Sequence, residues 1–345
     1  MTEKGKVPLM KISSTAKYAL GVTAAAAMLA GCSSGASSIS PTTPVAGAQA
    51  SHGSAVTLIA KAGLKVVPTH DSRPSQMSPD AKKAGQYLYV SDSGTDDVQV
   101  YAWPKPKSPV GTLTGFNEPQ GACADTSGNV YITNTGDFNI LEYKGGASSP
   151  SQTLSDPDGY PVGCSFDAKT GNLAVTNIIN KSYGQGNIDI YTKAKGTPKS
   201  YSNAAIYKPY FCGYDNKGTL WISGLNSSYA AVLASLTGKG KIKSSAVSGA
   251  TISFPGSTEY DGKQMTTGDQ EGAIAYQLKK FKVTGNTPLT GSSDIVQYWI
   301  DGGTSLIGPD AGNADVEIYA YPKGGSATQT LTGFSEPIGA AVTAK

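Results

Sequence analysis

The chain has 345 residues and a formal net charge of +3, and only 15% of its residues are charged. With so little net charge, and without a basic run that contains interleaved aromatic residues, the sequence excludes a typical nucleic-acid-binding surface. Low charge with 42 glycines and 19 tyrosines is typical of an exported all-β domain with many turns.

The first 31 residues have the pattern of an export signal. Lysines are frequent up to Lys17, and an apolar run follows from Tyr18 to Ala30. This run is shorter than the roughly 20 residues that a membrane span needs, and it fits the apolar region of a signal peptide. The run ends in Leu29-Ala30-Gly31-Cys32, which resembles a bacterial lipobox. The alternative is an ordinary signal peptide that happens to contain a cysteine.

The lipobox resemblance implies that Cys32 carries the lipid and becomes the first residue of the mature protein. The membrane is then a partner of the protein through this lipid, at the bacterial cell envelope. Ser33 follows the cysteine where an aspartate would otherwise favour retention at the inner membrane. The resemblance therefore favours the outer membrane or the cell surface.

Residues 32–84 are rich in Ser, Ala, Gly, Pro and Thr. A segment with few large apolar side chains cannot bury enough surface to offset its chain entropy. We expect a flexible tether between the lipid and the folded domain. One apolar stretch, Val56 to Val67, could dock on the domain, and the sequence leaves this open.

Residues 85–345 contain a repeat. Five segments begin with proline, namely PQGACAD at Pro119, PVGCSFD at Pro161, PYFCGYD at Pro209, PGSTEYD at Pro255 and PIGAAVT at Pro337. A glycine turn and further strands follow, with alternating apolar positions and many tyrosines. Pro119 and Pro337 are 218 residues apart, which is five intervals of about 44 residues. The stretch Ser293 to Asp301 supplies the copy that lacks the proline, so first strands number six.

This period predicts an all-β, six-bladed propeller of four-stranded blades. The domain opens with second, third and fourth strands, over about 87–114, and ends with a first strand at about 337–343. We expect these two ends to complete one blade, which closes the ring and removes two open sheet edges.

The pattern P-x-G-x-x-x-D-x-x-G-N-V-Y-I-T-N, which starts at Pro119, resembles the NHL repeat. More broadly it is similar to the six-bladed superfamily of SMP-30/gluconolactonase-like and streptogramin-lyase-like propellers. The resemblance covers about 260 residues, and it implies the architecture but not one activity, because this fold has many functions.

Signatures of catalysis are missing from the repeat region. Both histidines, His52 and His70, precede residue 85, so the ring has no histidine for acid–base or zinc chemistry. SMP-30-like lactonases place metal ligands in the middle of their first strands, where this sequence has Gln120, Val162, Tyr210, Gly256 and Ile338. The serines show no G-x-S-x-G nucleophile elbow.

Two glutamates, Glu118 and Glu336, each precede a first-strand proline. With ring closure they lie on neighbouring blades, near loops that carry Asp92, Asn134 and Asn177. These five residues form a candidate ligand site at the channel mouth, with no cofactor predicted. Calcium or magnesium at Glu118 and Glu336 is the alternative, since both ions prefer oxygen ligands. We favour a simpler interpretation, in which these Asp and Asn side chains stabilise turns. The same holds for the repeated Asp125, Asp167, Asp215 and Asp261.

Three cysteines, Cys123, Cys164 and Cys212, fall in consecutive first strands. Cys164 and Cys212 share one offset from their prolines, so this pair is the better candidate for a disulfide. Adjacent first strands could, however, exceed the Cα separation of about 4.4–6.8 Å that a disulfide allows. We prefer the alternative that all three are small buried hydrophobic residues.

Six aromatic residues lie in or near loops of the second to fourth predicted blades and could line a groove for sugar or peptide: Phe138, Tyr160, Tyr183, Tyr207, Tyr210 and Phe211. We therefore predict a non-enzymatic, lipid-anchored binding or scaffolding module for a protein, peptide or glycan, and we expect a monomer. The alternative is a divergent metal-dependent enzyme of the lactonase or lyase type, with its site at the channel mouth.

Overall fold

The computed structural model describes residues 73–79, 81 and 84–345. The chain divides into residues 1–51 and residues 52–345, and the architecture below concerns the second unit. The predicted signal peptide, Cys32 and residues 32–72 of the predicted tether lie outside the described residues. Within the described part, no helix is long and apolar enough to cross a membrane.

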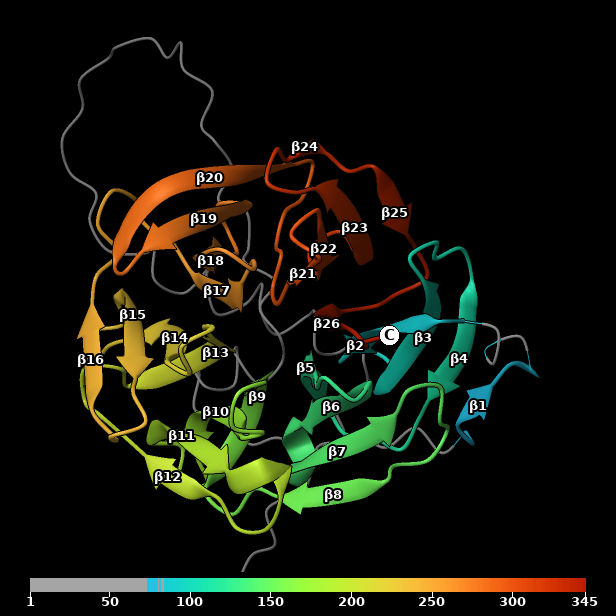
Figure 1. Ribbon diagram of the computed structural model, residues 1–345, viewed down its shortest axis with the longest axis horizontal. Helices are drawn as coiled ribbons and strands as arrows, with labels where there is room; N and C mark the ends of the chain where they lie inside the picture. The colour runs from blue at the N-terminus through green and yellow to red at the C-terminus, as the bar shows by residue number, and fades with distance from the viewer. Residues whose placement is uncertain (1–72, 80, 82–83) are drawn as a thin grey trace, which may run out of the picture. The chain divides into compact units, whose positions relative to one another are not determined.

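Six sheets are arranged around a central axis (Figure 1), and they are antiparallel throughout except that β24 pairs parallel with β20. We number them blades I to VI. The strands of blades I to III are β1 (Gln76–Met77), β2 (Gln86–Asp92), β3 (Asp97–Trp103), β4 (Pro109–Leu113) and β26 (Pro337–Val342) in blade I; β5 (Pro119–Ala124), β6 (Asn129–Asn134), β7 (Asn139–Lys144) and β8 (Gln152–Ser155) in blade II; and β9 (Gly159–Phe166), β10 (Leu173–Asn180), β11 (Gln185–Tyr191) and β12 (Lys199–Tyr201) in blade III.

The strands of blades IV to VI are β13 (Lys208–Tyr214), β14 (Leu220–Leu225), β15 (Ala231–Leu236) and β16 (Ile242–Ser245) in blade IV; β17 (Pro255–Tyr260), β18 (Met265–Asp269), β19 (Ile274–Lys279), β20 (Lys282–Thr290) and β24 (Gly325–Ser326) in blade V; and β21 (Trp299–Asp301), β22 (Ser305–Asp310), β23 (Asp315–Ala320) and β25 (Gln329–Leu331) in blade VI. Short 3-10 helices, η2 (Thr135–Asp137) and η3 (Thr192–Ala194), join strands in blades II and III. The predicted six-bladed propeller is confirmed.

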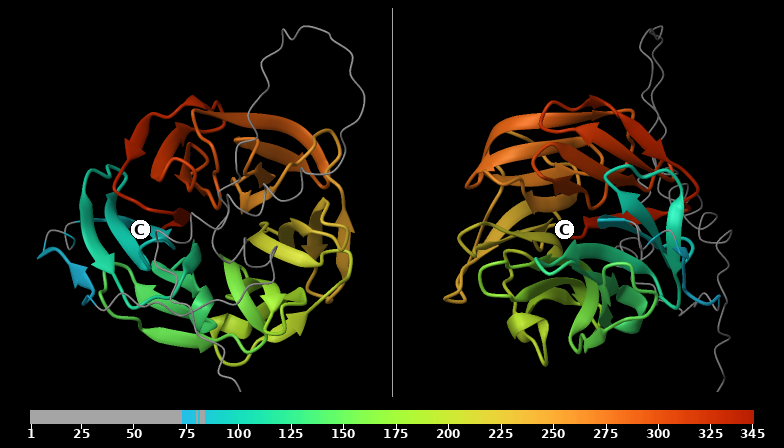
Figure 2. Two further views of the ribbon diagram at one scale, coloured as in Figure 1. Left: turned by 180° about the vertical axis from the view of Figure 1, so that it is seen from behind. Right: turned by 45° about the vertical axis from the view of Figure 1, so that its right-hand side comes forward.

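Blade I contains both ends of the ring, as predicted. The C-terminal strand β26 pairs antiparallel with β2, from Leu88 opposite Val342 to Asp92 opposite Pro337. The two strands lie side by side in Figure 1 and again from behind in Figure 2. Ordinary strand hydrogen bonds therefore close the ring and leave neither end as an open edge.

The domain begins earlier than the expected boundary at residue 85. Gln76 and Met77 form β1, which pairs antiparallel with the outer strand β4 of blade I. The Arg73 guanidinium lies 3.1 Å from the Asp97 carboxylate of the same blade. Arg73, Gln76 and Met77 therefore contact blade I, which the sequence did not predict because a two-residue strand gives too weak a periodic signal.

Alternation along each second strand joins the blades into one core. In β2, Leu88 and Val90 pack against blade VI, whereas Tyr89 between them packs against blade II. All three are fully buried. Because successive side chains of a strand point to opposite faces, a strand with apolar residues at every position can be buried on both sides. This explains the continuous apolar runs in the repeat.

The repeated aspartates are turn residues, as expected. Asp125 accepts hydrogen bonds from the backbone N–H groups of Ser127 and Asn129, and Asp215 accepts the equivalent pair from Lys217 and Thr219. A carboxylate in this position satisfies the N–H groups that a tight turn leaves without strand partners.

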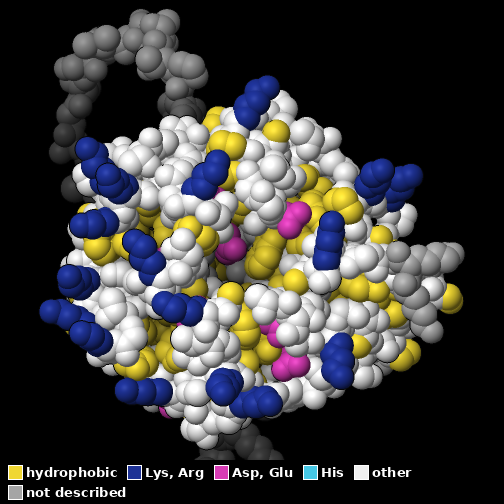
Figure 3. All heavy atoms as spheres, viewed as in Figure 1, with side chains coloured by type: hydrophobic (Ala, Val, Ile, Leu, Met, Phe, Trp, Pro, Cys, Tyr) yellow, Lys and Arg dark blue, Asp and Glu magenta, His cyan; other side chains and the backbone are white. Residues whose placement is uncertain are grey.

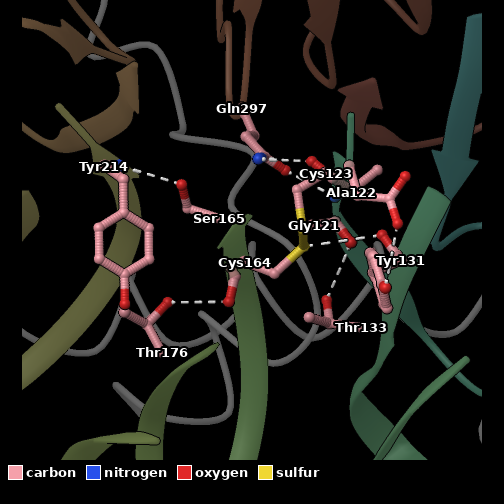
Figure 4. Close-up of a disulfide and its surroundings, with 12 residues drawn as sticks. Gly121, Ala122, Cys123, Tyr131, Thr133, Cys164, Ser165, Thr176, Tyr214 and Gln297 are labelled. Atoms are coloured by element: carbon pink, nitrogen blue, oxygen red, sulfur yellow. Dashed lines mark hydrogen bonds between the residues drawn. A yellow bond between two sulfur atoms is a disulfide. The ribbon is translucent and has the colours of Figure 1, made fainter. Parts of the chain in front are cut away.

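The disulfide joins Cys123 to Cys164, with a Cα–Cα distance of 5.7 Å (Figure 4). The predicted pairing of Cys164 with Cys212 was therefore wrong, and so was the view that all three are unpaired. Cys164 and Cys212 share one offset, so both side chains point towards the preceding blade and cannot meet. Cys123 lies one residue further along its strand, so it points towards the following blade and faces Cys164. Cys212 is the unpaired, buried hydrophobic residue that we expected.

Candidate functional site

In four of the six blades, an acidic or amide side chain at the end of the second strand accepts hydrogen bonds from the backbone that leads into an inner strand. Asp92, at the end of β2, accepts hydrogen bonds from the backbone N–H groups of Ser335 and Glu336, at 2.7 and 2.8 Å. In blade II, the side chain of Asn134 accepts from the N–H of Asn117 at 2.7 Å. Asp269 and Asp310 do the same in blades V and VI. Asp92 and Asn134, two of the candidate ligand residues, thus stabilise loops.

We expect Asp92→Ala to lower the free energy of unfolding by about 2 kcal/mol, because three buried or half-buried N–H groups lose their acceptor. Asp92→Asn keeps one acceptor oxygen and should lose less. Urea unfolding of both variants measures the difference. An Asp92→Ala variant as stable as the unmodified chain would show that this carboxylate does not stabilise the closure of the ring.

Six residues occupy one equivalent position, immediately before the inner strand's proline or its counterpart: Glu336, Glu118, Tyr160, Lys208, Phe254 and Asp294 in blades I to VI. Five of them are at most 7% exposed, and Glu336 is half-buried. Glu118 and Glu336 indeed lie on adjacent blades, since β5 and β26 are in contact. Two of these residues were not predicted from the sequence. They are Lys208, and Asp294 in blade VI, which lacks the proline that marks the position. Burial lowers the pKa of Lys208, whose Nζ lies 5.6 Å from the Tyr207 ring.

Two residues further along each inner strand, beyond the proline or its counterpart, apolar side chains fill most of the centre of the ring. Val162, Tyr210, Val296 and Ile338 belong to one buried cluster. Together with Gln120 and Gly256, these are the positions at which the sequence resemblance to SMP-30-like lactonases implied metal ligands. Figure 3 shows hydrophobic side chains towards the centre of the ring and most lysine and arginine side chains around its periphery. An apolar plug cannot hold a hydrated divalent cation at this level.

Among the described residues, one group of three carboxylates is close enough to share a cation, and it does not include Glu118 or Glu336. Asp310, Asp315 and Glu317 place one oxygen each within 4.8 Å of one another. Asp310 already accepts hydrogen bonds from the backbone N–H groups of its loop. Burial and the neighbouring Asp310 raise the pKa of Asp315 to about 6, so protonation relieves part of the repulsion.

Aromatic side chains gather at the hairpin tips of blades II to IV. Phe138, Tyr183 and Tyr229 each lie between the second and third strand with a positive φ of 56°, 62° and 60°. The equivalent residues of blades V, VI and I are Ala273, Ala314 and Asp96. Bulky side chains are uncommon in this left-handed conformation, which costs them roughly 1–2 kcal/mol. Half of the ring therefore has large aromatic residues where the other half has small or polar ones.

The aromatic tips connect to the central apolar cluster. The Phe138 ring lies 4.8 Å from the Tyr160 ring, and the Lys181 Nζ lies 4.5 Å above Phe138. The Tyr160 hydroxyl donates to the Tyr183 hydroxyl at 3.1 Å. Tyr210 and Phe211 belong to the same cluster, whereas Tyr207 packs beside Lys208. Tyr229 is 56% exposed, and its turn is built by Asn226 without the tyrosine side chain.

Asn177, the fifth candidate residue, lies between two buried aspartates. Its Nδ2 donates to Asp156 at 3.1 and 3.2 Å and to Asp189 at 3.1 Å. All three side chains are fully buried. Burial, and then the charge of Asp189, raise the pKa of Asp156 to about 8, and burial also raises the pKa of Asp189. The two carboxyl groups therefore share a proton at neutral pH.

No protein-family model matches the chain, and no curated protein matches it significantly. Solved structures match well. A chain of a nidogen–laminin complex has a TM-score of 0.61 at 15% identity, over 75% of this chain and 98% of that one. A protein of unknown function from Bacteroides caccae has a TM-score of 0.58 at 13% identity, over 75% and 99%. A catalytically inactive histidine-to-alanine variant of virginiamycin B lyase from Staphylococcus aureus, with quinupristin, has a TM-score of 0.53 at 12% identity, over 80% and 92%. These similarities show the fold.

Proposed function

We propose that this chain is a non-enzymatic binding module of the bacterial envelope, anchored through a lipid on Cys32. Its binding surface is the face that carries the hairpin tips of blades II to IV. The observation that carries the proposal is the set of aromatic tips Phe138, Tyr183 and Tyr229, held in a backbone conformation that disfavours them. Tyr229 is exposed, whereas Phe138 and Tyr183 are half-buried against the central cluster. Strained backbone conformations cluster at functional sites, and aromatic side chains supply much of the contact energy at binding surfaces.

Two similar folds frame this proposal. One neighbour is a chain of a nidogen–laminin complex, in which proteins bind one another. The other is a lyase that is inactive without one of its histidines. Residues 85–345 of this chain contain no histidine. The side chain of Asn134, which the enzyme alternative needs, donates to Asp137 and Asn139 and accepts from Asn117. The binding alternative is therefore better supported.

The tips give a prediction in which stability and binding change in opposite directions. Tyr229→Gly should leave the melting temperature unchanged or raise it, with a gain of up to about 1 kcal/mol, because glycine tolerates positive φ. The same variant should lose binding to whichever member of a glycan and peptide array the unmodified chain binds. Ala273→Gly is the matched control, because it relaxes the equivalent turn in blade V and should not change binding. If no array member binds, or if the two variants bind alike, this surface is not the binding site.

The anchor is tested separately. Incorporation of a palmitate analogue should label the chain in a bacterial host, and Cys32→Ala should abolish the labelling. Because the tether separates the lipid from the ring, the variant should retain the melting temperature of the ring. Labelling that persists in Cys32→Ala would contradict the proposed lipid site.

A further inference from the structure

A small cavity lies where the inner strands end, at the opposite end of these strands from Glu118 and Glu336. Its volume is about 170 Å³. Equivalent positions of successive blades form rings around the axis of a propeller. The residues four positions after the inner-strand proline, or after its counterpart in blade VI, line the cavity in five of the six blades: Cys123, Ser165, Gly213, Glu259 and Trp299. Five blades therefore contribute to one concave surface.

The wall of the cavity is held rigidly on two sides. On one side it includes the disulfide between Cys123 and Cys164, which joins blades II and III (Figure 4). On the other side, blades IV and V approach so closely that a Cβ atom on Gly213 would lie 2.3 Å from the carbonyl oxygen of Thr258. Glu259 is the next residue on that strand. The cavity and its glutamate are thus fixed before any ligand arrives.

The carboxyl group of Glu259 is unused by the protein. Thr266 donates to the backbone carbonyl of Glu259, but the carboxyl group makes no hydrogen bond or ion pair with a described residue. Its oxygens are not among the fully enclosed polar atoms of the described residues, so they remain open to the cavity. Burial raises the pKa of Glu259 to about 8. The ionised form lacks a counter-charge and the protonated form lacks an acceptor, so a cation in the cavity would stabilise this residue.

The rest of the wall selects the kind of cation. The described lining residues include one carboxyl group and neither lysine nor arginine, so the complementary ligand carries a single positive charge. Most of the other side chains are apolar, and the Ser165 hydroxyl already accepts from the N–H of Tyr214 at 3.0 Å. A primary ammonium or a guanidinium brings three or more N–H donors that need acceptors, whereas a fully methylated ammonium brings none. The half-buried Trp299 borders the cavity, and tryptophan is the aromatic side chain that attracts such cations best.

We propose that this cavity binds a methylated ammonium group, with Glu259 as its counter-charge and Trp299 beside it. Because the site lies at the end of the inner strands opposite the hairpin tips, it goes beyond the proposed binding function. Sites for drug-sized ligands have volumes of about 300–1,000 Å³, so this cavity takes one compact group of a ligand. The same group occurs on free small molecules such as choline and on trimethylated lysine side chains of polypeptides.

Isothermal titration of the full chain at about pH 9 with tetramethylammonium, choline and N-acetyl-trimethyllysine amide tests the inference and distinguishes the two sources. We expect saturable binding of at least one of these cations, and at least tenfold weaker binding of neopentyl alcohol, an uncharged molecule of similar shape. Glu259→Gln should weaken binding of the cation by tenfold or more, which corresponds to about 1.4 kcal/mol. Glu271→Gln removes the same charge from an exposed position of the same blade and should bind as the unmodified chain does.

The pH dependence of binding gives a second measurement on the unmodified chain. The charge of tetramethylammonium does not change with pH, and the ion binds the ionised form of Glu259. Its affinity should therefore fall about tenfold from pH 9 to pH 7, because the ionised fraction falls by that factor. Cys212 and Tyr298 lie close enough to sense the charge of Glu259, and Tyr214 and Tyr260 share the cavity. Burial raises the pKa of Cys212, Tyr214 and Tyr298, so these three groups stay neutral over this range.

Three outcomes would overturn the inference: no cation binds, neopentyl alcohol binds as tightly as the cations, or Glu259→Gln binds as the unmodified chain does. If Glu259→Gln does not fold, the unmodified chain still decides, since an affinity for tetramethylammonium that is equal at pH 7 and pH 9 excludes Glu259 as the counter-charge. The proposed binding surface at the hairpin tips is tested separately, by Tyr229→Gly on the glycan and peptide array.

Discussion

The variant Cys123→Ser/Cys164→Ser is expected to unfold with a free energy about 4 kcal/mol lower than that of the unmodified chain. The disulfide closes a loop with a sequence separation of 41 residues, and chain entropy in the unfolded state accounts for an effect of about this size. It also joins the inner strands of blades II and III, whose side chains form one buried cluster around it. Guanidinium unfolding, monitored by tryptophan fluorescence, measures the loss.

The third cysteine provides the control. Cys212 occupies the position in blade IV that Cys164 occupies in blade III, but it has no disulfide partner. Cys212→Ala removes one buried sulfur and should cost about 1 kcal/mol. Dithiothreitol should lower the unfolding midpoint of the unmodified chain to that of the double serine variant. It should lower the midpoint of Cys212→Ala by the same amount, because that variant keeps the disulfide. An unmodified chain that does not respond to the reductant would show that the disulfide contributes no stability.

The fold could be predicted from the sequence because each blade repeats the same local rules. A proline lies at or near the start of five inner strands, and an aspartate follows four of these prolines after six residues. Both residues have local causes. Ring closure followed from counting strands, since the first blade had no inner strand until Pro337 supplied one. Where a local signal was weak, as in the two residues of β1, the prediction failed.

The disulfide pairing could not be predicted from offsets alone. Equal offsets at Cys164 and Cys212 suggest equal height, but equal height on equivalent strands also means equal direction. A partner must therefore differ by an odd number of residues, as Cys123 does. The sequence contained this information, and the alternation rule applied between blades would have found it.

The candidate site was predicted in part. Glu118 and Glu336 lie on adjacent blades. Of the six aromatic residues that could have lined a groove, however, Tyr160, Tyr210 and Phe211 are buried in the core. The positive φ of Phe138, Tyr183 and Tyr229 could not be predicted, because turn conformation depends on the strands on both sides. Nor could the pairing of Asp156 with Asp189, which are 33 residues apart in sequence and both accept hydrogen bonds from Asn177.

That carboxyl pair predicts a pH dependence of stability. The pKa of Asp156 rises from 3.8 to about 8 on folding, so between these values the folded state holds a proton that the unfolded state has released. The free energy of unfolding therefore decreases as pH rises from about 4 to about 8, by up to about 1.4 kcal/mol per pH unit for one proton. Urea unfolding at half-unit pH steps measures this slope.

Replacing both acids with amides should remove the contribution of the pair. Asp156→Asn/Asp189→Asn cannot ionise at either position, so its stability should fall less steeply with pH, and the variant should exceed the unmodified chain at pH 8. The pH slope of stability of each single variant should lie between the slopes of the unmodified chain and the double variant, because burial still raises the pKa of the remaining acid. Other titrating groups contribute equally to all four proteins and cancel in the differences. A double variant with the unmodified slope would mean that this pair does not share a proton and that other groups cause the pH dependence.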